Sequence, residues 1–189
     1  MILTLIRHGL TEGNVKRLYY GSTDLPLLEE SVEMLKCANI NGIYPTAPLF
    51  FTSGMKRTEQ TLEALYGSIG HGILSGLREI DFGDFEMRTY EELKEDPAYL
   101  NWISGDTETD RVPNGESGVI VTQRALNDLE PLICGDTDAV CVTHGGVIGG
   151  LMCHWFPSEN GRFDYTPDPG TGYSILFEEG VPVSYIKIP

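Results

Sequence analysis

Two apolar runs in the chain each lead into a histidine, and this repeated pattern constrains the fold more than any other feature. The run at 2–6 is followed by Arg7 and His8, and the run at 139–143 is followed by His144. Both runs are short, apolar and rich in β-branched residues, so they predict buried strands. Because open α/β sheets form their ligand crevices at the carboxyl ends of strands, we expect both histidines in one site.

Strand and helix patterns alternate along the rest of the chain. Further strands are predicted at 49–52, 173–177 and 183–188, with a weaker one at 72–74, and helices at 55–66, 116–133 and 147–155. This alternation predicts an α/β fold, a three-layer α/β/α sandwich with a mainly parallel sheet. The turn at 177–183 predicts a terminal hairpin that adds one antiparallel strand. Because no repeat or linker interrupts the chain, we expect a single domain over residues 1–189.

The charge balance restricts the partners. With 28 acidic and 13 basic residues, the formal net charge is −15. Nucleic acid and anionic membranes are therefore not expected partners, because both need a dense basic face. A small anionic substrate would need a local positive pocket that acts at short range.

Two further features bear on the location of the protein. No segment has the length and apolar character of a membrane span, so we expect a soluble protein. The first residues form a predicted strand directly before His8, and a cleavable signal peptide there would destroy the site. A cytoplasmic location is therefore predicted.

The cysteines and the remaining histidines do not predict a metal site. The four cysteines lie in apolar stretches without a CxxC pair, which favours reduced, buried thiols. The histidine spacing has neither a short-range pair nor an intervening carboxylate, so zinc is not expected. His71 and His154 match no motif and are expected to be structural or surface residues.

The residues after the first strand form a recognisable motif. Arg7, His8 and Gly9 supply a fixed cation, a candidate nucleophile and a close backbone approach, which together suit a phosphoryl group. The chain continues through Asn14 and then reads Tyr-Tyr-Gly-Ser-Thr-Asp-Leu-Pro-Leu at 19–27. This order resembles the histidine phosphatase superfamily, also called phosphoglycerate mutase-like.

The resemblance extends over most of the chain. The segment at 52–61 is similar to the second arginine motif of the family and contains Arg57, and the segment at 77–86 is similar to the one that carries the family's acid, Glu79. The segment at 113–117 opens a helix as in the family. His144, with Gly145, matches the second-histidine motif.

The resemblance implies a mechanism and a fold like that of phosphoglycerate mutases. His8 would attack phosphorus and Glu79 would protonate the leaving oxygen, while Arg7, Arg57 and a protonated His144 stabilise the transferring group. Four further residues are expected to contact the substrate: Asn14, Tyr20, Gly21 and Gly145. The implied substrate is a small-molecule phosphate ester, with no metal or cofactor, and the sequence does not predict an oligomeric state.

Several alternatives stay open at this stage. The short segment at 96–113 has Arg111 as its one cation and would give little support to a doubly anionic glycerate, which favours hydrolysis. A cofactor-dependent phosphoglycerate mutase is the alternative enzyme. The stretch at 19–27 looks most like the α-ribazole phosphatase branch, but broad-specificity phosphatases share much of it. Tyr20 and Met87 depart from the family pattern, which motivates a non-catalytic phospho-ligand binding module as a third hypothesis.

Individual side chains in the motifs also have alternative roles. Three carboxylates compete with Glu79 for the acid role: Asp81, Asp84 and Glu86. Four aromatic residues are candidate walls for a ring-bearing leaving group: Tyr20, Phe82, Tyr99 and Trp102. Phe82 and Trp102 could equally be core residues. The two arginines could be surface ion-pair partners instead.

Overall fold

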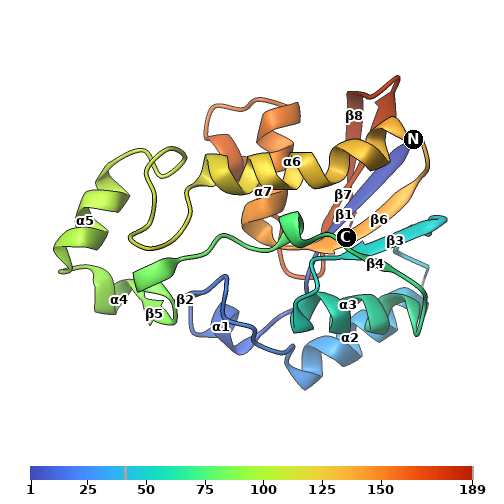
Figure 1. Cartoon of the computed structure of the whole chain (residues 1–189). Helices are drawn as coiled ribbons and strands as arrows, with labels where there is room; N and C mark the ends of the chain where they lie inside the picture. Colours follow the sequence, from blue (N-terminus) through green and yellow to red (C-terminus); the bar gives the residue numbers. More distant parts are fainter. Residues whose placement is uncertain (41, 189) are drawn as a thin grey trace.

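The computed structural model describes residues 1–40 and 42–188 and contains a six-stranded central sheet (Figure 1). The strands lie in the order β4 (Gly72–Ile73), β3 (Leu49–Thr52), β6 (Ala139–Thr143), β1 (Ile2–Arg7), β7 (Gly172–Glu178) and β8 (Val181–Ile188). β4, β3, β6 and β1 are parallel, whereas β7 is antiparallel to both of its neighbours. The predicted mainly parallel sheet with one antiparallel strand is therefore confirmed.

Two pairs of helices cover the two faces of the sheet. α6 (Gly118–Cys134) and α7 (Gly145–Trp155) pack on one face, and α2 (Glu29–Ile40) and α3 (Lys56–Tyr66) pack on the other (Figure 1). Leu3 and Leu5 of β1 point into the core beneath α6 and α7, whereas Ile6 points into the core beneath α2 and α3. Because both faces of the central strands are covered, their side chains are apolar and buried on both sides. The chain thus forms the predicted three-layer α/β/α sandwich.

A third, smaller core lies beside the sandwich, within the segment that connects β4 to α6. This segment contains the short elements η1 (Ser75–Leu77), η2 (Gly83–Phe85), β5 (Arg88–Thr89), α4 (Tyr90–Leu93) and α5 (Pro97–Ser104). The other short elements are α1 (Glu12–Val15) and β2 (Leu18–Tyr19), which follow β1, and η3 (Gly161–Asp164), which follows α7. Phe85, Leu93, Tyr99, Trp102 and Val112 form the core. β2 and β5 pair as a two-stranded ribbon next to it.

The predicted strands and helices lie within two residues of observed elements. β3 and β6 coincide with the predicted runs, and the predicted helices begin and end within two residues of α3, α6 and α7. The predictions omitted α2 and the short helices. Within residues 1–40 and 42–188, no helix combines the length and the apolar character needed to cross a bilayer.

Candidate active site

The ends of three neighbouring parallel strands bring the candidate site together. Ser53 follows β3, His144 follows β6, and His8 follows β1. In the register of β1 and β6, Arg7 lies opposite Thr143, so the next residues are the two histidines. Their imidazole rings meet edge to face with centroids 5.2 Å apart. The carboxyl edge of the sheet thus places both histidines in one buried cluster.

His8 is held in a single tautomer. Its side chain is buried, and Nδ1 lies 2.6 Å from the carbonyl oxygen of Gly9. Because a carbonyl only accepts hydrogen bonds, Nδ1 carries the proton and Nε2 carries the lone pair. Burial, followed by the Arg57 cation, lowers the pKa of His8 well below its ordinary value. His8 is therefore neutral near pH 7 and has a nucleophilic nitrogen.

His144 is also neutral, which differs from the protonated state expected from the resemblance. Arg57 Nε donates to His144 Nδ1 at 3.2 Å, and His144 Nε2 lies 2.8 Å from the hydroxyl oxygen of Ser53. Since Nδ1 accepts, Nε2 carries the single ring proton and donates to Ser53. Burial, followed by the Arg57 cation, lowers the pKa of His144 well below its ordinary value. A cationic role for His144 would require proton uptake when an anion binds.

Arg57 is a fully buried cation near the start of α3. Its Nη1 donates to the carbonyl of Thr23 at 3.0 Å and its Nη2 to the carbonyl of Gly21 at 2.9 Å. The guanidinium lies over the Tyr20 ring, 5.1 Å from the centroid. These contacts fix its orientation and leave N–H donors for a ligand, because a guanidinium carries five.

Arg7 approaches the cluster from β1. Its Nη1 donates to the carbonyl of Pro167 at 2.7 Å, and its buried Nε has no partner among the described residues. The guanidinium packs against Gly145, where a Cβ would lie 3.0 Å from Arg7 Cζ. A buried guanidinium donor without a partner is costly unless an acceptor binds there. The structure therefore supports an indirect role for Gly145, which provides space for Arg7.

Glu79 reaches the amino end of α7, beside His144. Its Oε2 accepts from the backbone N–H of Gly146 at 3.1 Å, and its Oε1 accepts from the N–H of Ile80 at 3.0 Å. A Cβ on Gly146 would lie 2.5 Å from Glu79 Oε1, so only glycine leaves room for the carboxylate. The helix thus positions this side chain next to the histidine cluster.

The three competing carboxylates have hydrogen-bond partners of their own. Asp81 accepts from the N–H of Gly83 at 2.8 Å, and exposed Asp84 accepts from the side chain of Asn114. Glu86 holds the loop at 21–23. These contacts favour Glu79 over the others as the group that faces the histidines.

Sequence reasoning named Glu86 only as an alternative acid, whereas the structure shows its carboxylate bound to the loop at 21–23. Its carboxylate accepts from the N–H groups of Gly21, Ser22 and Thr23 at 2.8, 3.0 and 3.2 Å, and also from the N–H of Phe82. Burial disfavours ionisation, but the hydrogen bonds from Thr23, Phe82 and the loop outweigh it and lower the pKa of Glu86. Glu86 thereby fixes the loop whose carbonyls hold Arg57.

Three expected substrate contacts need revision or refinement. The N–H of Gly21 donates to Glu86 and its carbonyl accepts from Arg57, so both backbone groups of Gly21 are engaged within the protein. Tyr20 donates its hydroxyl proton to Thr11, because the Thr11 hydroxyl itself donates to Asn14 Oδ1 at 2.9 Å. These two hydrogen bonds orient the Asn14 side chain, whose amide nitrogen can still donate to a ligand.

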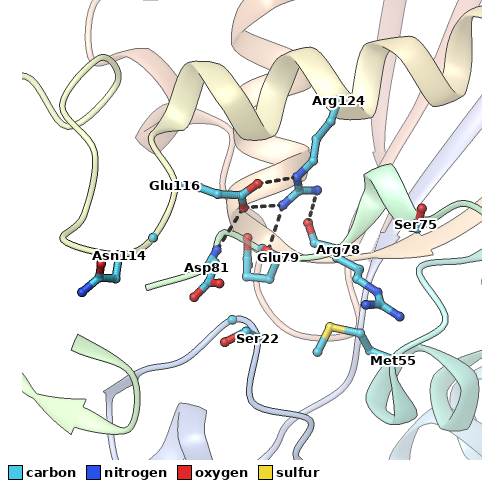
Figure 2. Close-up of a pocket in the computed structure, with 11 residues that line it drawn as sticks. Ser22, Met55, Ser75, Arg78, Glu79, Asp81, Asn114, Glu116 and Arg124 are labelled. Carbon is cyan, nitrogen blue, oxygen red and sulfur yellow. Dashed lines mark hydrogen bonds and ion pairs between the residues drawn. The ribbon is translucent and has the colours of Figure 1, made fainter. Parts of the chain in front are cut away.

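A polar cavity of about 300 Å³ adjoins the cluster at Glu79 (Figure 2). Its polar lining comprises Ser22, Ser75, Arg78, Glu79, Asp81, Asn114, Glu116 and Arg124. Among the described residues that line it, Met55 is the one large apolar side chain. Figure 2 shows Arg78 and Asp81 on either side of Glu79.

The aromatic residues expected as pocket walls lie elsewhere. Tyr99 and Trp102 are buried in the third core, and Phe82 packs against it. Tyr20 lies beneath Arg57. None of these four rings lines the cavity beside Glu79. In the described part of the chain, no three His, Cys, Asp or Glu side chains are grouped as a candidate metal site.

Comparison with known proteins identifies the class. Residues 3–183 match the profile of the histidine phosphatase superfamily (branch 1), so the chain belongs to this superfamily, as the sequence motifs indicated. The chain is 30% identical over 160 residues to the adenosylcobalamin/α-ribazole phosphatase of Salmonella typhimurium, covering 80% of this chain and 78% of the relative.

Mutases are also similar to this chain in sequence and fold. A protein named as a probable phosphoglycerate mutase from Cronobacter sakazakii is 31% identical over 161 residues, covering 78% of this chain and 71% of the relative. The crystal structure of phosphoglycerate mutase from Thermus thermophilus superposes with a TM-score of 0.77 at 28% identity, covering 100% of this chain and 99% of that one. The superfamily thus includes both phosphatases and mutases among the relatives of this chain, and its fold is phosphoglycerate mutase-like.

Proposed function

We propose that this chain hydrolyses phosphate monoesters of small molecules through a covalent phosphohistidine at His8. The observation that carries this proposal is the state of His8, whose Nδ1 donates to the carbonyl of Gly9 and whose Nε2 therefore holds a lone pair. Two guanidinium groups, Arg7 and Arg57, lie in the same buried cluster. A neutral imidazole beside fixed cations is suited to attack a phosphoryl group.

In the first step, His8 Nε2 forms a bond to phosphorus as the bond to the ester oxygen breaks. Glu79 gives its proton to the leaving alcohol oxygen. The hydrogen bond from Nδ1 to Gly9 stabilises the positive charge that develops on the imidazole. Arg7 and Arg57 stabilise the charge on the three equatorial oxygens, and Arg57 suits this role because its orientation is fixed before the substrate binds.

In the second step, water forms a bond to phosphorus as the bond to His8 Nε2 breaks. The ionised Glu79 accepts a proton from the water, which returns the acid to its starting state. The neutral imidazole is regenerated. Each step is performed by side chains of this chain, so we expect turnover in the presence of a chelator.

The cavity beside Glu79 supports a polar alcohol as the leaving group. Ser22, Asp81 and Asn114 line it and can bind hydroxyl groups, whereas the aromatic residues pack away from it. We therefore propose a small, hydroxylated phosphate ester as the substrate. α-Ribazole 5′-phosphate is one such ester, and the similarity to an α-ribazole phosphatase makes it the first to test.

A mutase is the second candidate function. The similarity to phosphoglycerate mutases motivates it, and Arg78 in the cavity supplies a cation that could bind a glycerate carboxylate. A mutase would isomerise phosphoglycerate only when primed with a bisphosphate. Isomerisation that exceeds hydrolysis under these conditions would favour the mutase.

The third hypothesis is a binding module without turnover. Tyr20 and Met87 motivated it, but Tyr20 orients Arg57 and Asn14, and Met87 lies outside the lining of the cavity beside Glu79. Neither departure from the family pattern therefore removes a group that the mechanism uses.

The test is release of inorganic phosphate from a panel of monoesters in the presence of EDTA. We expect hydrolysis by the wild type and none by His8→Ala. Arg57→Ala should lose roughly 3 kcal/mol of transition-state stabilisation, as is typical for removal of a charge-stabilising donor. Absence of hydrolysis of every ester by the folded wild type, or an unchanged rate in His8→Ala, would refute the proposal.

A further inference from the structure

Arg124, on helix α6, uses all five N–H donors of its guanidinium around the segment that carries Glu79. Nε and Nη2 donate to the two carboxylate oxygens of Glu116 at 2.9 and 2.8 Å. Nη1 donates to the carbonyls of Gly76 and Arg78, each at 2.6 Å, and Nη2 also donates to the carbonyl of Glu79 at 3.0 Å. Figure 2 shows the ion pair above Glu79, with its bonds reaching down to this segment.

Glu116 extends the same network past Glu79. Its Oε2 accepts from the N–H of Asp81 at 3.1 Å, and its own N–H donates to the carbonyl of Asp81 at 2.9 Å. Burial opposes ionisation of this carboxyl, but the hydrogen bonds from Arg124 and Asp81 outweigh it and lower the pKa of Glu116. Glu116 is therefore an anion that pairs with Arg124 and binds the backbone two residues after Glu79.

The two side chains hold the backbone on both sides of Glu79. The carbonyls of Arg78 and Glu79 are bound by Arg124, and the N–H of Asp81 is bound by Glu116. With this backbone fixed, the carboxylate of Glu79 accepts a hydrogen bond from the N–H of Gly146, beside the histidine cluster. A lysine could not replace Arg124, because it has three donors and no planar fork.

We propose that Arg124, paired with Glu116, is the positioning residue for the catalytic acid. The pair fixes the backbone at Glu79 so that the carboxyl group lies where it can protonate the leaving oxygen. This inference rests on the proposed function, in which Glu79 is the acid. Proton donation matters most for leaving groups of high pKa, so loss of Arg124 should affect such esters selectively.

The experiment compares wild type, Arg124→Lys and Arg124→Gln on two esters in EDTA. Glycerol 2-phosphate releases a basic alkoxide and needs the acid, whereas 4-nitrophenyl phosphate releases a weakly basic phenolate. General acid catalysis is worth about 10²- to 10⁴-fold, so a displaced acid should lower kcat/KM for glycerol 2-phosphate by about 10- to 100-fold. We expect kcat/KM for 4-nitrophenyl phosphate to fall less than about threefold, because the phosphate contacts are untouched and kcat/KM reports the transfer from the ester to His8, before Glu79 acts as the base.

Asp128→Ala is the matched control. Asp128 lies one turn further along α6 and accepts from the N–H of Gly76 at 2.6 Å, so it holds the same segment without touching the backbone at Glu79. Its loss should change both esters by the same factor. Thermal unfolding of every variant measures the structural cost, and Arg124→Lys serves as the test if Arg124→Gln does not fold.

The outcomes separate this inference from the function on which it rests. A selective loss on glycerol 2-phosphate in a folded Arg124 variant supports the positioning role. Equal losses on both esters, or full activity in Arg124→Lys, would overturn it while His8-dependent hydrolysis by the wild type remained. If the wild type hydrolysed neither ester, the proposed function itself would be refuted.

Discussion

The contact between Gly146 and Glu79 predicts that Gly146→Ala lowers the activity without lowering the stability of the fold. A Cβ at this position would lie 2.5 Å from Glu79 Oε1 and 3.3 Å from its Cδ. Since non-bonded heavy atoms prefer about 3.5 Å, the carboxylate must move by roughly 1 Å. The moving atom is the end of a flexible side chain, so the fold can accommodate the change.

The expected effects have opposite signs. Gly146 is the second residue of α7, where alanine favours the helix by up to about 1 kcal/mol. We therefore expect the melting temperature to be unchanged or raised. A misplacement of about 1 Å can cost on the order of 100-fold in rate, and we expect a loss of 10- to 100-fold in kcat/KM for an alkyl phosphate. The loss should be smaller for 4-nitrophenyl phosphate, which needs less proton donation.

Steady-state kinetics on both esters, with thermal unfolding of the same samples, checks this prediction. Gly70→Ala is a suitable control, because a Cβ there meets no atom within 4 Å. It should leave both rates unchanged. If Gly146→Ala folded normally and hydrolysed the alkyl ester at the wild-type rate, Glu79 would not be the proton donor in the position that the structure shows.

Three further predictions concern pH, backbone strain and the loop that holds Arg57. Burial lowers the pKa of both His8 and His144, so below about pH 6.5 the unfolded chain takes up protons that the folded chain does not. The free energy of unfolding should therefore fall as the pH decreases from about 6.5 to the folded pKa values. The expected slope is up to about 1.4 kcal/mol per pH unit for each histidine. Urea denaturation at several pH values measures this slope, and an undiminished slope in a folded His8→Gln variant would contradict the assignment. Met87 has a φ of 61°, a left-handed backbone conformation that costs a residue with a side chain about 1–2 kcal/mol. Met87→Gly should therefore stabilise the protein relative to Met87→Ala. Equal melting temperatures of the two variants would show that the strain is absent. Glu86→Gln replaces an acceptor oxygen with an amide that faces N–H donors, so we expect a loss of about 1–3 kcal/mol in stability. We also expect a higher KM, because the loop at 21–23 holds Arg57. An unchanged KM would show that this loop does not contribute to phosphate binding.

The positions of the two histidines could be predicted from the sequence because they depend on local patterns. The apolar runs before His8 and His144 are long enough to read as buried strands, and parallel strands bring their carboxyl ends to one edge. Helix α2 was harder to predict, since Met34 and Ile40 are 73% and 83% exposed and interrupt any apolar stripe. Only its acidic first turn, with Glu29, indicates a helix.

The positioning residues could not be predicted, because their roles come from long-range contacts. Glu86 is one of 28 acidic residues, and its contacts with the loop at 21–23 cross more than 60 positions of sequence. Arg124 similarly reaches the Glu79 segment from a helix some 45 residues away. The aromatic residues were ambiguous for a different reason: Tyr99 and Trp102 suit a pocket wall and a core equally well, and tertiary packing places them in the core.

The most direct test of the account is to trap the phosphoenzyme and locate the phosphoryl group. Wild type and Glu79→Gln would be mixed with 4-nitrophenyl phosphate, quenched in alkali and mapped by mass spectrometry. We predict a phosphoryl group on His8 that accumulates further in Glu79→Gln, because that variant lacks the base for the second step, and no phosphoryl group in His8→Asn. Modification of another residue, or hydrolysis by His8→Asn at the wild-type rate, would contradict the central claim that His8 is the nucleophile.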